Sequence, residues 1–253
     1  MPRLFILSGC NGAGKTTASY TFLPEILDCR EFVNSDEFAK SLSPFDPSIA
    51  SVSASRYMLM RIQYLLDHNA DFSIETTLAT RSLVSIIKEA KERNYKITLI
   101  YLWLQNPELA IQRVRDRVAS GGHNIPEDVL RRRYKMGIHY LFNTYMSLCD
   151  NWIIADNTHP PFTVIAEGNS ERTLIKDDVK FKKIMTDNGL EQFDPTGESF
   201  DPQKHEAFMQ KPSFEYPENT VSTTLQPGYT VNGNIIKHAQ VVVSSGCPGG
   251  RDA

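Results

Sequence analysis

A nine-residue stretch near the N-terminus carries the clearest chemistry in this sequence. It fits the pattern G-x-x-x-x-G-K-[ST], which is typical of phosphate-binding loops. Glycines let the backbone wrap closely around an anion, and successive N–H groups then point at its oxygens. The pattern predicts a nucleotide site formed by Gly9, Cys10, Asn11, Gly12, Ala13, Gly14, Lys15, Thr16 and Thr17.

Two side chains of this loop have separate predicted roles. Lys15 would supply a positive charge to the β- and γ-phosphates of ATP, and the Thr16 hydroxyl would be a ligand for Mg²⁺. The alternative is a glycine-rich turn with an unrelated lysine. The apolar residues 4–7 and the helix-forming residues 16–23 supply the strand–loop–helix context that the motif needs, so ATP and Mg²⁺ are favoured.

Two further predicted strands carry carboxylates at their ends: Asp36 follows the strand at residues 31–34, and the strand at 71–77 ends in Glu75 and two threonine hydroxyls. Functional groups gather at the carboxyl ends of parallel strands, which places Asp36, Glu75 and Thr76 near the phosphates. Asp36 could accept a proton from an attacking hydroxyl or hold Mg²⁺ through water, and a helix N-cap is its alternative role. Glu75 and Thr76 are predicted to contact the substrate, with a structural ion pair as the alternative for Glu75.

The strand predicted at residues 97–104 has no aspartate at its end, so Asp36 is the leading metal-side carboxylate. Two helices then follow and carry several arginines. We predict that they form a lid whose Arg117, Arg132 and Arg133 neutralise charge on a transferring phosphoryl group. A solvated basic face is the alternative, and phasing at about 100° per residue ranks Arg133 above Arg132.

Strand–helix alternation continues to about residue 187 and predicts an α/β fold, a P-loop NTPase three-layer parallel sheet with a helical lid. Residues 162–167 and 172–175 are predicted to pair as a hairpin across Gly168, Asn169 and Ser170. The composition then becomes rich in Asp, Pro and Gly, and helical periodicity is lost. We therefore predict two domains, at 1–187 and 188–253. The second is a small all-β module ending in a loose tail at 246–253, with strands at 208–210, 220–225, 229–231 and 240–244.

Composition excludes several classes of protein. The 253 residues carry a net charge of −3, which gives no general attraction to nucleic acid or anionic lipid, and no stripe of basic and aromatic residues marks a nucleic-acid path. The longest apolar run is too short to span a bilayer, and no signal peptide is evident. The four cysteines lack metal-ligand spacing and predict free thiols, with a cytoplasmic location as the default.

The N-terminal motifs together resemble the zeta-toxin family of P-loop kinases. The resemblance covers about residues 1–185 and rests on the P-loop, N-S-D-E-F at 34–38, I-E-T-T-L at 74–78, R-V-x-x-G-G-H-x-I-P at 117–126, R-R-Y at 132–134 and D-N at 156–157. It implies ATP-dependent phosphorylation of UDP-N-acetylglucosamine at the sugar 3′-hydroxyl, and an antitoxin as a partner. Asp36 would then be the general base, Glu75 a sugar contact, and Arg117 with Arg132 or Arg133 the phosphate-binding lid.

A second resemblance begins near residue 193. F-D-P-Q-K-H-E-A at 200–207, G-Y at 228–229 and I-I-K-H-A-Q-V-V-V at 235–243 are similar to the C-terminal β-domain of GrpE, the nucleotide exchange factor of DnaK-type chaperones. Lys237 stands where arginine is usual in that family. GrpE dimerises through a long N-terminal helix, and this sequence shows no such helix, so the tail corresponds to a GrpE head without its stalk.

These patterns leave three functions open. The first is a kinase for a sugar nucleotide. The second is a binding module in which a degenerate P-loop domain carries a GrpE-like head to a DnaK-type chaperone; the intact Lys15, Thr16 and Asp36 argue against degeneracy. The third is a P-loop kinase whose acceptor is a nucleoside, a small metabolite or an RNA end.

Overall fold

The computed structural model describes residues 1–47, 49–122, 124–169, 172–231 and 234–247. It divides into two compact units, Met1–Phe181 and Lys182–Ala253, which are described separately. Ser170 of the predicted hairpin turn and residues 248–253 of the predicted tail lie outside the described residues. Within the described part of the chain, no helix combines the length and the apolar character needed to cross a bilayer.

The first unit is built on a seven-stranded sheet with the strand order β2-β3-β1-β4-β5-β6-β7. The first five strands in this order are parallel, and β6 and β7 add an antiparallel hairpin at one edge. This confirms the predicted α/β class with a parallel core, and it confirms the predicted hairpin. The strands are β1 (Arg3–Ser8), β2 (Phe32–Val33), β3 (Phe72–Thr76), β4 (Lys96–Trp103), β5 (Asn151–Asp156), β6 (Thr163–Gly168) and β7 (Thr173–Ile175).

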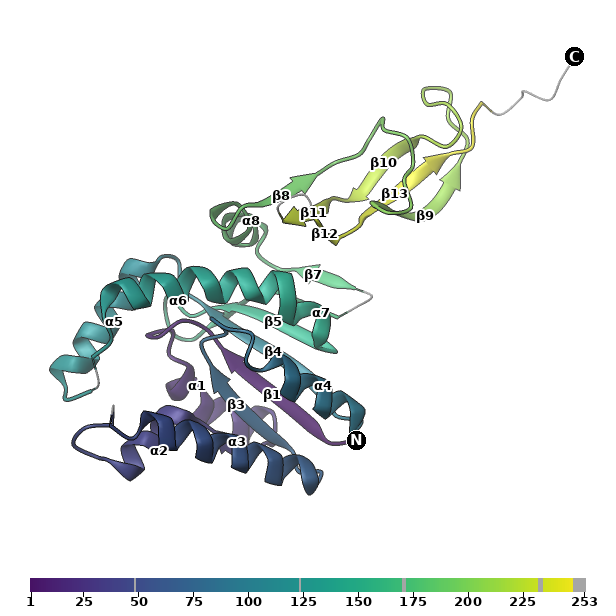
Figure 1. Ribbon diagram of the computed structural model, residues 1–253. Helices are drawn as coiled ribbons and strands as arrows, with labels where there is room; N and C mark the ends of the chain where they lie inside the picture. Colours follow the sequence, from purple (N-terminus) through teal and green to yellow (C-terminus); the bar gives the residue numbers. More distant parts are fainter. Residues whose placement is uncertain (48, 123, 170–171, 232–233, 248–253) are drawn as a thin grey trace, which may run out of the picture. The chain divides into compact units, whose positions relative to one another are not determined.

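Helices cover both faces of this sheet (Figure 1). They are α1 (Lys15–Thr21), α2 (Ser35–Leu42), α3 (Ser51–Asp67), α4 (Val84–Glu92), α5 (Pro107–Ala119), α6 (Glu127–Tyr140), α7 (Met146–Leu148) and α8 (Asp178–Asp187), with π-helical turns at η1 (Phe22–Ile26) and η2 (Leu141–Tyr145). The central strands β1 and β4 are almost fully buried, because helices on both faces remove them from water. They form a rigid platform for the residues that follow their carboxyl ends.

The second unit contains two three-stranded sheets, with orders β10-β13-β9 and β12-β11-β8. The small all-β module is therefore confirmed, although the short strands β8 and β12 were not predicted. The strands are β8 (Leu190–Phe193), β9 (His205–Lys211), β10 (Val221–Gln226), β11 (Gly228–Val231), β12 (Asn234–Lys237) and β13 (Ala239–Ser244). Its core is small: Val221, Ala239, Val241 and Val243 pack with Phe193 and Phe200.

Candidate active site

Two adjoining cavities open at the carboxyl edge of the seven-stranded sheet. The larger, of about 750 Å³, is lined by the phosphate-binding loop together with Arg113, Arg117 and residues that follow β5. The smaller, of about 350 Å³, lies against α2, α3 and the end of β3. Both cavities share four lining residues, Asn11, Lys15, Asp36 and Glu75. A group bound in one cavity would thus meet a group bound in the other at this shared wall.

The phosphate-binding loop has the backbone that its glycines require. Gly12 and Gly14 have φ angles of +80° and +81°, which side chains rarely allow. A Cβ on Gly14 would come within 2.6 Å of Asn157 Nδ2, and the same Asn157 amide donates a hydrogen bond to the carbonyl of Ala13 at 2.7 Å. The turn after β5 therefore braces the loop from the outside, and glycine at position 14 makes room for it.

Lys15 and Glu75 form the buried centre of the shared wall. The Lys15 ammonium donates to the Cys10 carbonyl at 3.0 Å, and its Nζ lies 3.7 Å from Glu75 Oε1. The Lys15 and Glu75 side chains are only 6% and 11% exposed, so their charges are poorly screened by water. Glu75 Oε2 also accepts a hydrogen bond from the Thr16 hydroxyl at 2.8 Å. Glu75 thus contacts the loop as well as lining the smaller cavity.

Strand register explains why Glu75 reaches the loop. β3 pairs with β1 so that Glu75 lies beside Leu7, two residues before the loop begins at Gly9. The next residue, Thr76, accepts a hydrogen bond from the Leu78 amide at 3.0 Å and lines the smaller cavity. Leu78 has a φ of +58°, a costly conformation for a bulky residue, and strain of this kind clusters at functional sites.

Asp36 lies in the first turn of α2 and lines both cavities. The N-cap of this helix is Asn34, whose Oδ1 accepts hydrogen bonds from the amides of Asp36 at 2.8 Å and Glu37 at 3.4 Å. The capping function that the sequence allowed for Asp36 is therefore performed by Asn34. The Asp36 carboxylate remains directed to the cavities rather than committed to the cap.

The predicted lid arginines occupy three different environments. Arg117 lines the larger cavity. Arg133 lines the smaller one and donates to Asn11 Oδ1 at 3.0 Å. Arg132 is exposed and lines neither cavity. The structure therefore brings Arg117 and Arg133 to the site and leaves Arg132 on the outer face of α6.

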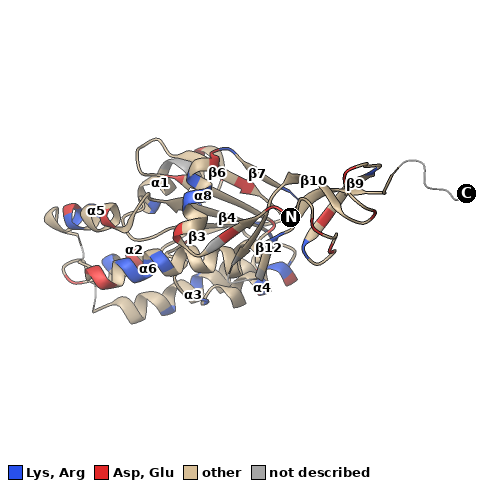
Figure 2. Ribbon diagram, turned by 90° about the horizontal axis from the view of Figure 1, so that it is seen from above, with Lys and Arg blue, Asp and Glu red and all other residues tan. Residues whose placement is uncertain are grey.

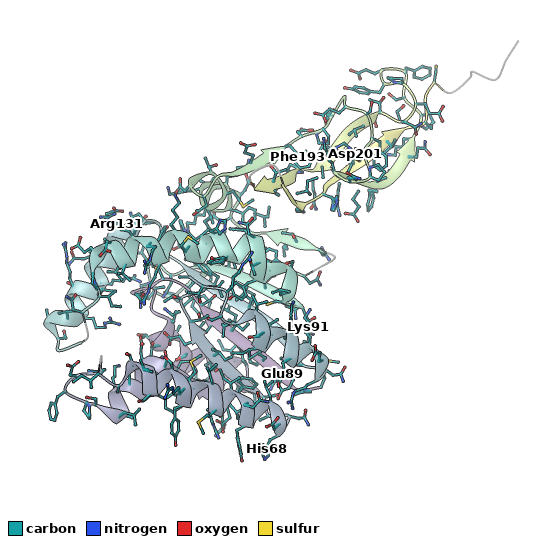
Figure 3. The ribbon with its side chains drawn as sticks, viewed as in Figure 1. His68, Glu89, Lys91, Arg131, Phe193 and Asp201 are labelled. Carbon is teal, nitrogen blue, oxygen red and sulfur yellow. The ribbon has the colours of Figure 1, made fainter. Side chains whose placement is uncertain are left out.

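Ion pairs tie the two lid helices together. Arg131 on α6 lies 2.6 Å from Glu108 on α5, and Arg115 on α5 pairs with Glu127 on α6. Figure 2 shows acidic and basic positions along both helices, and Figure 3 shows Arg131 on α6. Exposed pairs of this kind contribute at most about 1 kcal/mol each, so they orient the helices more than they stabilise the fold.

Sequence reasoning missed Arg113 and Asn34. Arg113 donates to the Gly12 carbonyl at 3.3 Å and to the Thr158 carbonyl at 2.8 Å, so it joins the loop to the turn after β5. Its spacing of four residues from Arg117 was the available signal, because this spacing puts both on one helix face. No sequence signal separated Asn34 from an ordinary strand end.

The far end of the larger cavity is apolar. Ile26 from η1 and Pro160, Pro161 and Phe162 from the turn after β5 line it. Flat apolar walls of this type suit an aromatic base.

Asp156 holds the turn after β5 in place. Burial alone would raise the pKa of this carboxyl, but hydrogen bonds from Thr158 and the Lys180 ammonium lower it.

Cys10 offers no reactive group to the site. Its side chain is buried, and burial raises the pKa of the thiol to about 11 even though Lys15 and Arg113 lie nearby. The thiol therefore stays protonated at neutral pH and acts as a small apolar group. All four cysteines are free thiols, as predicted.

Mg²⁺ is implied by the loop, and the residues present fit it. The Thr16 hydroxyl, the Glu75 carboxylate and the Asp36 carboxylate all border the larger cavity and offer only oxygen atoms. Oxygen donors of this kind, completed by phosphates and water, are those that Mg²⁺ prefers.

Comparison with solved structures shows that this fold occurs in other proteins. The complex of AvrRxo1-ORF1 with AvrRxo1-ORF2, solved with sulphate ions, superposes with a TM-score of 0.58 at 19% identity, over 73% of this chain and 63% of that one. This chain thus spans less than two thirds of that structure. The PezAT toxin–antitoxin system of Streptococcus pneumoniae gives a TM-score of 0.55 at 17% identity, over 71% of this chain and 76% of that one.

The sequence matches identify the family. The zeta toxin family model matches residues 1–139, more than half of the chain. An uncharacterised protein of Haemophilus influenzae is 31% identical over 126 residues, which is 50% of this chain and 88% of that protein. The chain belongs to the zeta toxin family.

The C-terminal region matches a second family. The GrpE family model matches residues 133–245. The GrpE protein of Shewanella halifaxensis is 29% identical over 174 residues, which is 64% of this chain and 84% of that protein. Both predicted resemblances are therefore confirmed, and the GrpE match begins within α6 rather than at the second unit.

Proposed function

We propose that this protein transfers the γ-phosphoryl group of ATP to a hydroxyl of a sugar nucleotide, such as the 3′-hydroxyl of UDP-N-acetylglucosamine. The observation that carries the proposal is the wall shared by two cavities and formed by Asn11, Lys15, Asp36 and Glu75. ATP would occupy the larger cavity, with its phosphates on the loop and its base between Ile26 and Phe162. One neighbouring structure, of the AvrRxo1 complex, was solved with ATP.

The smaller cavity suits an acceptor rich in hydroxyl groups. Its polar lining includes Ser35, Ser55, Thr76, Thr77 and Ser82. Among the described residues, its cations are Lys15 and Arg133. Hydroxyl and amide groups can both donate to and accept from sugar hydroxyls. Met58, Leu59 and Leu83 add an apolar surface for the face of a ring. A nucleoside or another small polyol is the alternative acceptor, and it would use the same groups.

The residues of the shared wall and their neighbours have separate roles in the proposed reaction. The acceptor oxygen forms a bond to the γ-phosphorus while the bond from that phosphorus to the bridging oxygen of ADP breaks. Asp36 takes the proton that the acceptor hydroxyl loses. Lys15, Arg117 and Arg133 stabilise the negative charge on the transferring group, and Thr16 and Glu75 would hold Mg²⁺. When bound, Mg²⁺ neutralises charge on the β- and γ-phosphates.

The test is a screen of nucleotide sugars, nucleosides and free sugars for ATP-dependent phosphorylation, with products identified by mass spectrometry. Asp36→Asn is the matched control, because the amide keeps the shape and loses the basicity. We expect turnover to fall about 10²-fold or more while ATP affinity is nearly unchanged. Phosphorylation of a nucleoside instead of a sugar nucleotide would identify a nucleoside as the acceptor. A collapse of ATP affinity in Asp36→Asn would mean that Asp36 holds the metal or supports the fold.

A second candidate function rests on the C-terminal unit. The GrpE match suggests that this unit binds a DnaK-type chaperone. A pull-down of the chaperone with the full chain, and nucleotide release from the chaperone in its presence, would test this function. An antitoxin partner, by analogy with the toxin–antitoxin PezAT system, would be tested by co-purification with the product of a neighbouring gene.

A further inference from the structure

We propose that Asn34 is a positioning residue that fixes the Asp36 carboxylate relative to the phosphate-binding loop. This inference rests on the proposed role of Asp36 as the general base. Asn34 is 5% exposed, and both ends of its amide are engaged. Its Oδ1 accepts from the amides of Asp36 and Glu37, and its Nδ2 donates to Glu75 Oε2 at 2.8 Å.

The sheet order explains why one side chain can make this link. β3 lies between β2 and β1, and Val33 of β2 is paired with Ile74 of β3. Asn34 follows Val33 and Glu75 follows Ile74, so the parallel register brings Asn34 and Glu75 side by side at the same edge of the sheet. On its other side, Glu75 contacts Thr16 and Lys15 of the loop. The chain of contacts runs from the loop to Glu75, then to Asn34, then to the first turn of α2.

This link controls the position of the Asp36 carboxylate, and general-base catalysis depends on that position. A base must lie within hydrogen-bond reach of the acceptor proton, and an error of about 1 Å can cost about 10²-fold in rate. Asp36 lies two residues beyond Asn34, at the start of a helix of only eight residues. A cap alone would hold the helix together but would leave it free to shift relative to β3. The hydrogen bond to Glu75 removes that freedom.

Asn34→Asp separates capping from positioning. Aspartate caps helices as well as asparagine does, so the bonds to the Asp36 and Glu37 amides survive. The Nδ2 donor, however, is replaced by an oxygen that faces Glu75 Oε2. A carboxylate oxygen cannot donate a hydrogen bond to Glu75, so the link from the first turn of α2 to Glu75 is lost.

The variant should therefore lower kcat without a matching change in KM, which a purely capping role would not produce. We expect the kcat of Asn34→Asp to be about tenfold or more below wild type, because the Asp36 carboxylate is no longer held in place. The KM for ATP should change much less than kcat.

A matched control comes from α5. Asn106 caps this helix through a hydrogen bond from the Leu109 amide at 2.9 Å, and among the described residues it makes no hydrogen bond to a carboxylate. Asn106→Asp should leave kcat as in wild type. Asn34→Ser is a second variant, because serine caps well but is too short to reach Glu75. It should lose kcat in the same way, with little loss of thermal stability.

Turnover is measured as ADP formation, both with UDP-N-acetylglucosamine and without an acceptor, so that water can take its place. An unchanged kcat in Asn34→Asp, or a KM for ATP that rises as much as kcat falls, would overturn the inference. If wild type forms no ADP under either condition, the proposed function fails instead. The link is then judged by thermal unfolding: Asn34→Asp loses the bond to Glu75 and should unfold at a lower temperature than wild type while Asn106→Asp does not, and equal behaviour of the two variants would overturn it.

Discussion

The carboxyl edge of the large sheet and the core of the second unit both bury polar side chains, but they treat them differently. At the sheet edge, Lys15, Glu75 and Asn34 are bonded to one another or to the loop. In the second unit, His205 is 3% exposed and packs near Phe193 and Phe200, and among the described residues its Nε2 has no hydrogen-bond partner. Figure 3 labels Phe193 in this unit.

The difference shows what each region is built to hold. A buried charge is tolerated only when it is paired and hydrogen-bonded, so a connected network such as that around Glu75 can keep charges ready for phosphate. The second unit instead buries a ring with one unsatisfied polar atom in a small apolar cluster. The unsatisfied Nε2 of His205 therefore limits the stability of the second unit. The predictions below test this contrast.

The largest effect is expected from Lys15→Ala. The substitution removes the charge on the transferring group and also leaves Glu75 buried without its cation. We expect kcat, measured as ADP formation, to fall about 10²–10³-fold or more, as is typical when one stabilising group is removed. Retention of more than about a tenth of wild-type kcat would place the chemistry elsewhere.

A smaller effect should distinguish Arg133 from its neighbour on α6. Arg133→Ala loses the bond to Asn11 and removes a cation from the lining of the smaller cavity, so kcat should fall about tenfold or more. Arg132→Ala is the matched control, because Arg132 is exposed and lines neither cavity. Steady-state kinetics of the two variants shows whether Arg133, and not Arg132, contributes to turnover. Equal losses would mean that α6 moves during turnover and brings Arg132 inward.

Parts of this site could be predicted from sequence because they are local. The phosphate-binding loop is a contiguous motif with its own strand and helix, and the phasing of α6 is a property of nearby residues. The contact of Glu75 with Thr16 is different, because it depends on the register between β3 and β1. The link from Glu75 to Asn34 needs a second register, between β2 and β3. Neither register can be predicted from the spacing of neighbouring residues in the sequence.

The second unit shows the same limit. β9, β10 and β13 have six or seven residues and were predicted, and so was most of the four-residue β11. β8 and β12, also of four residues, were not predicted. Their pairing with β11 defines them. Likewise, Asp36 was predicted as a functional residue from its place after a strand, but its freedom from capping depends on the conformation of Asn34.

A modest pH effect should appear in the second unit. Burial lowers the pKa of His205 below its ordinary value of 6.5, although Asp201 and Glu198 oppose the shift. The unfolded state then binds the proton more readily, so stability is complete above pH 6.5 and decreases as the pH falls through the folded-state pKa. Lysines and histidines that pair with carboxylates would show the opposite sign.

Hydrogen exchange of the full chain can measure this effect. Opening of β13, followed at Val241 and Val243 and corrected for intrinsic rates, should be more frequent at pH 5.5 than at pH 7.5. His205→Gln removes the titrating group and should flatten the difference. Ile100 in β4 of the first unit is the internal control and should not respond. A pH response that persists in His205→Gln would assign the titration to another group.

The smallest effect on catalysis is expected from removing the second unit. Ending the chain after residue 189 keeps α8, whose Lys180 pairs with Asp156 at 2.9 Å and whose Phe181 packs on Phe142. All residues that line the two cavities lie before position 163. We therefore expect kcat within about twofold of the full chain, because few contacts cross a domain boundary.

Nucleotide release from a DnaK-type chaperone should be accelerated little by the full chain, because the described residues of the C-terminal unit form no long helix through which it could dimerise. An inactive or insoluble truncation would mean that the second unit completes the kinase fold. Rapid chaperone nucleotide release would mean that this unit acts without a stalk, and the contrast between a charged catalytic edge and an inert apolar module would no longer hold.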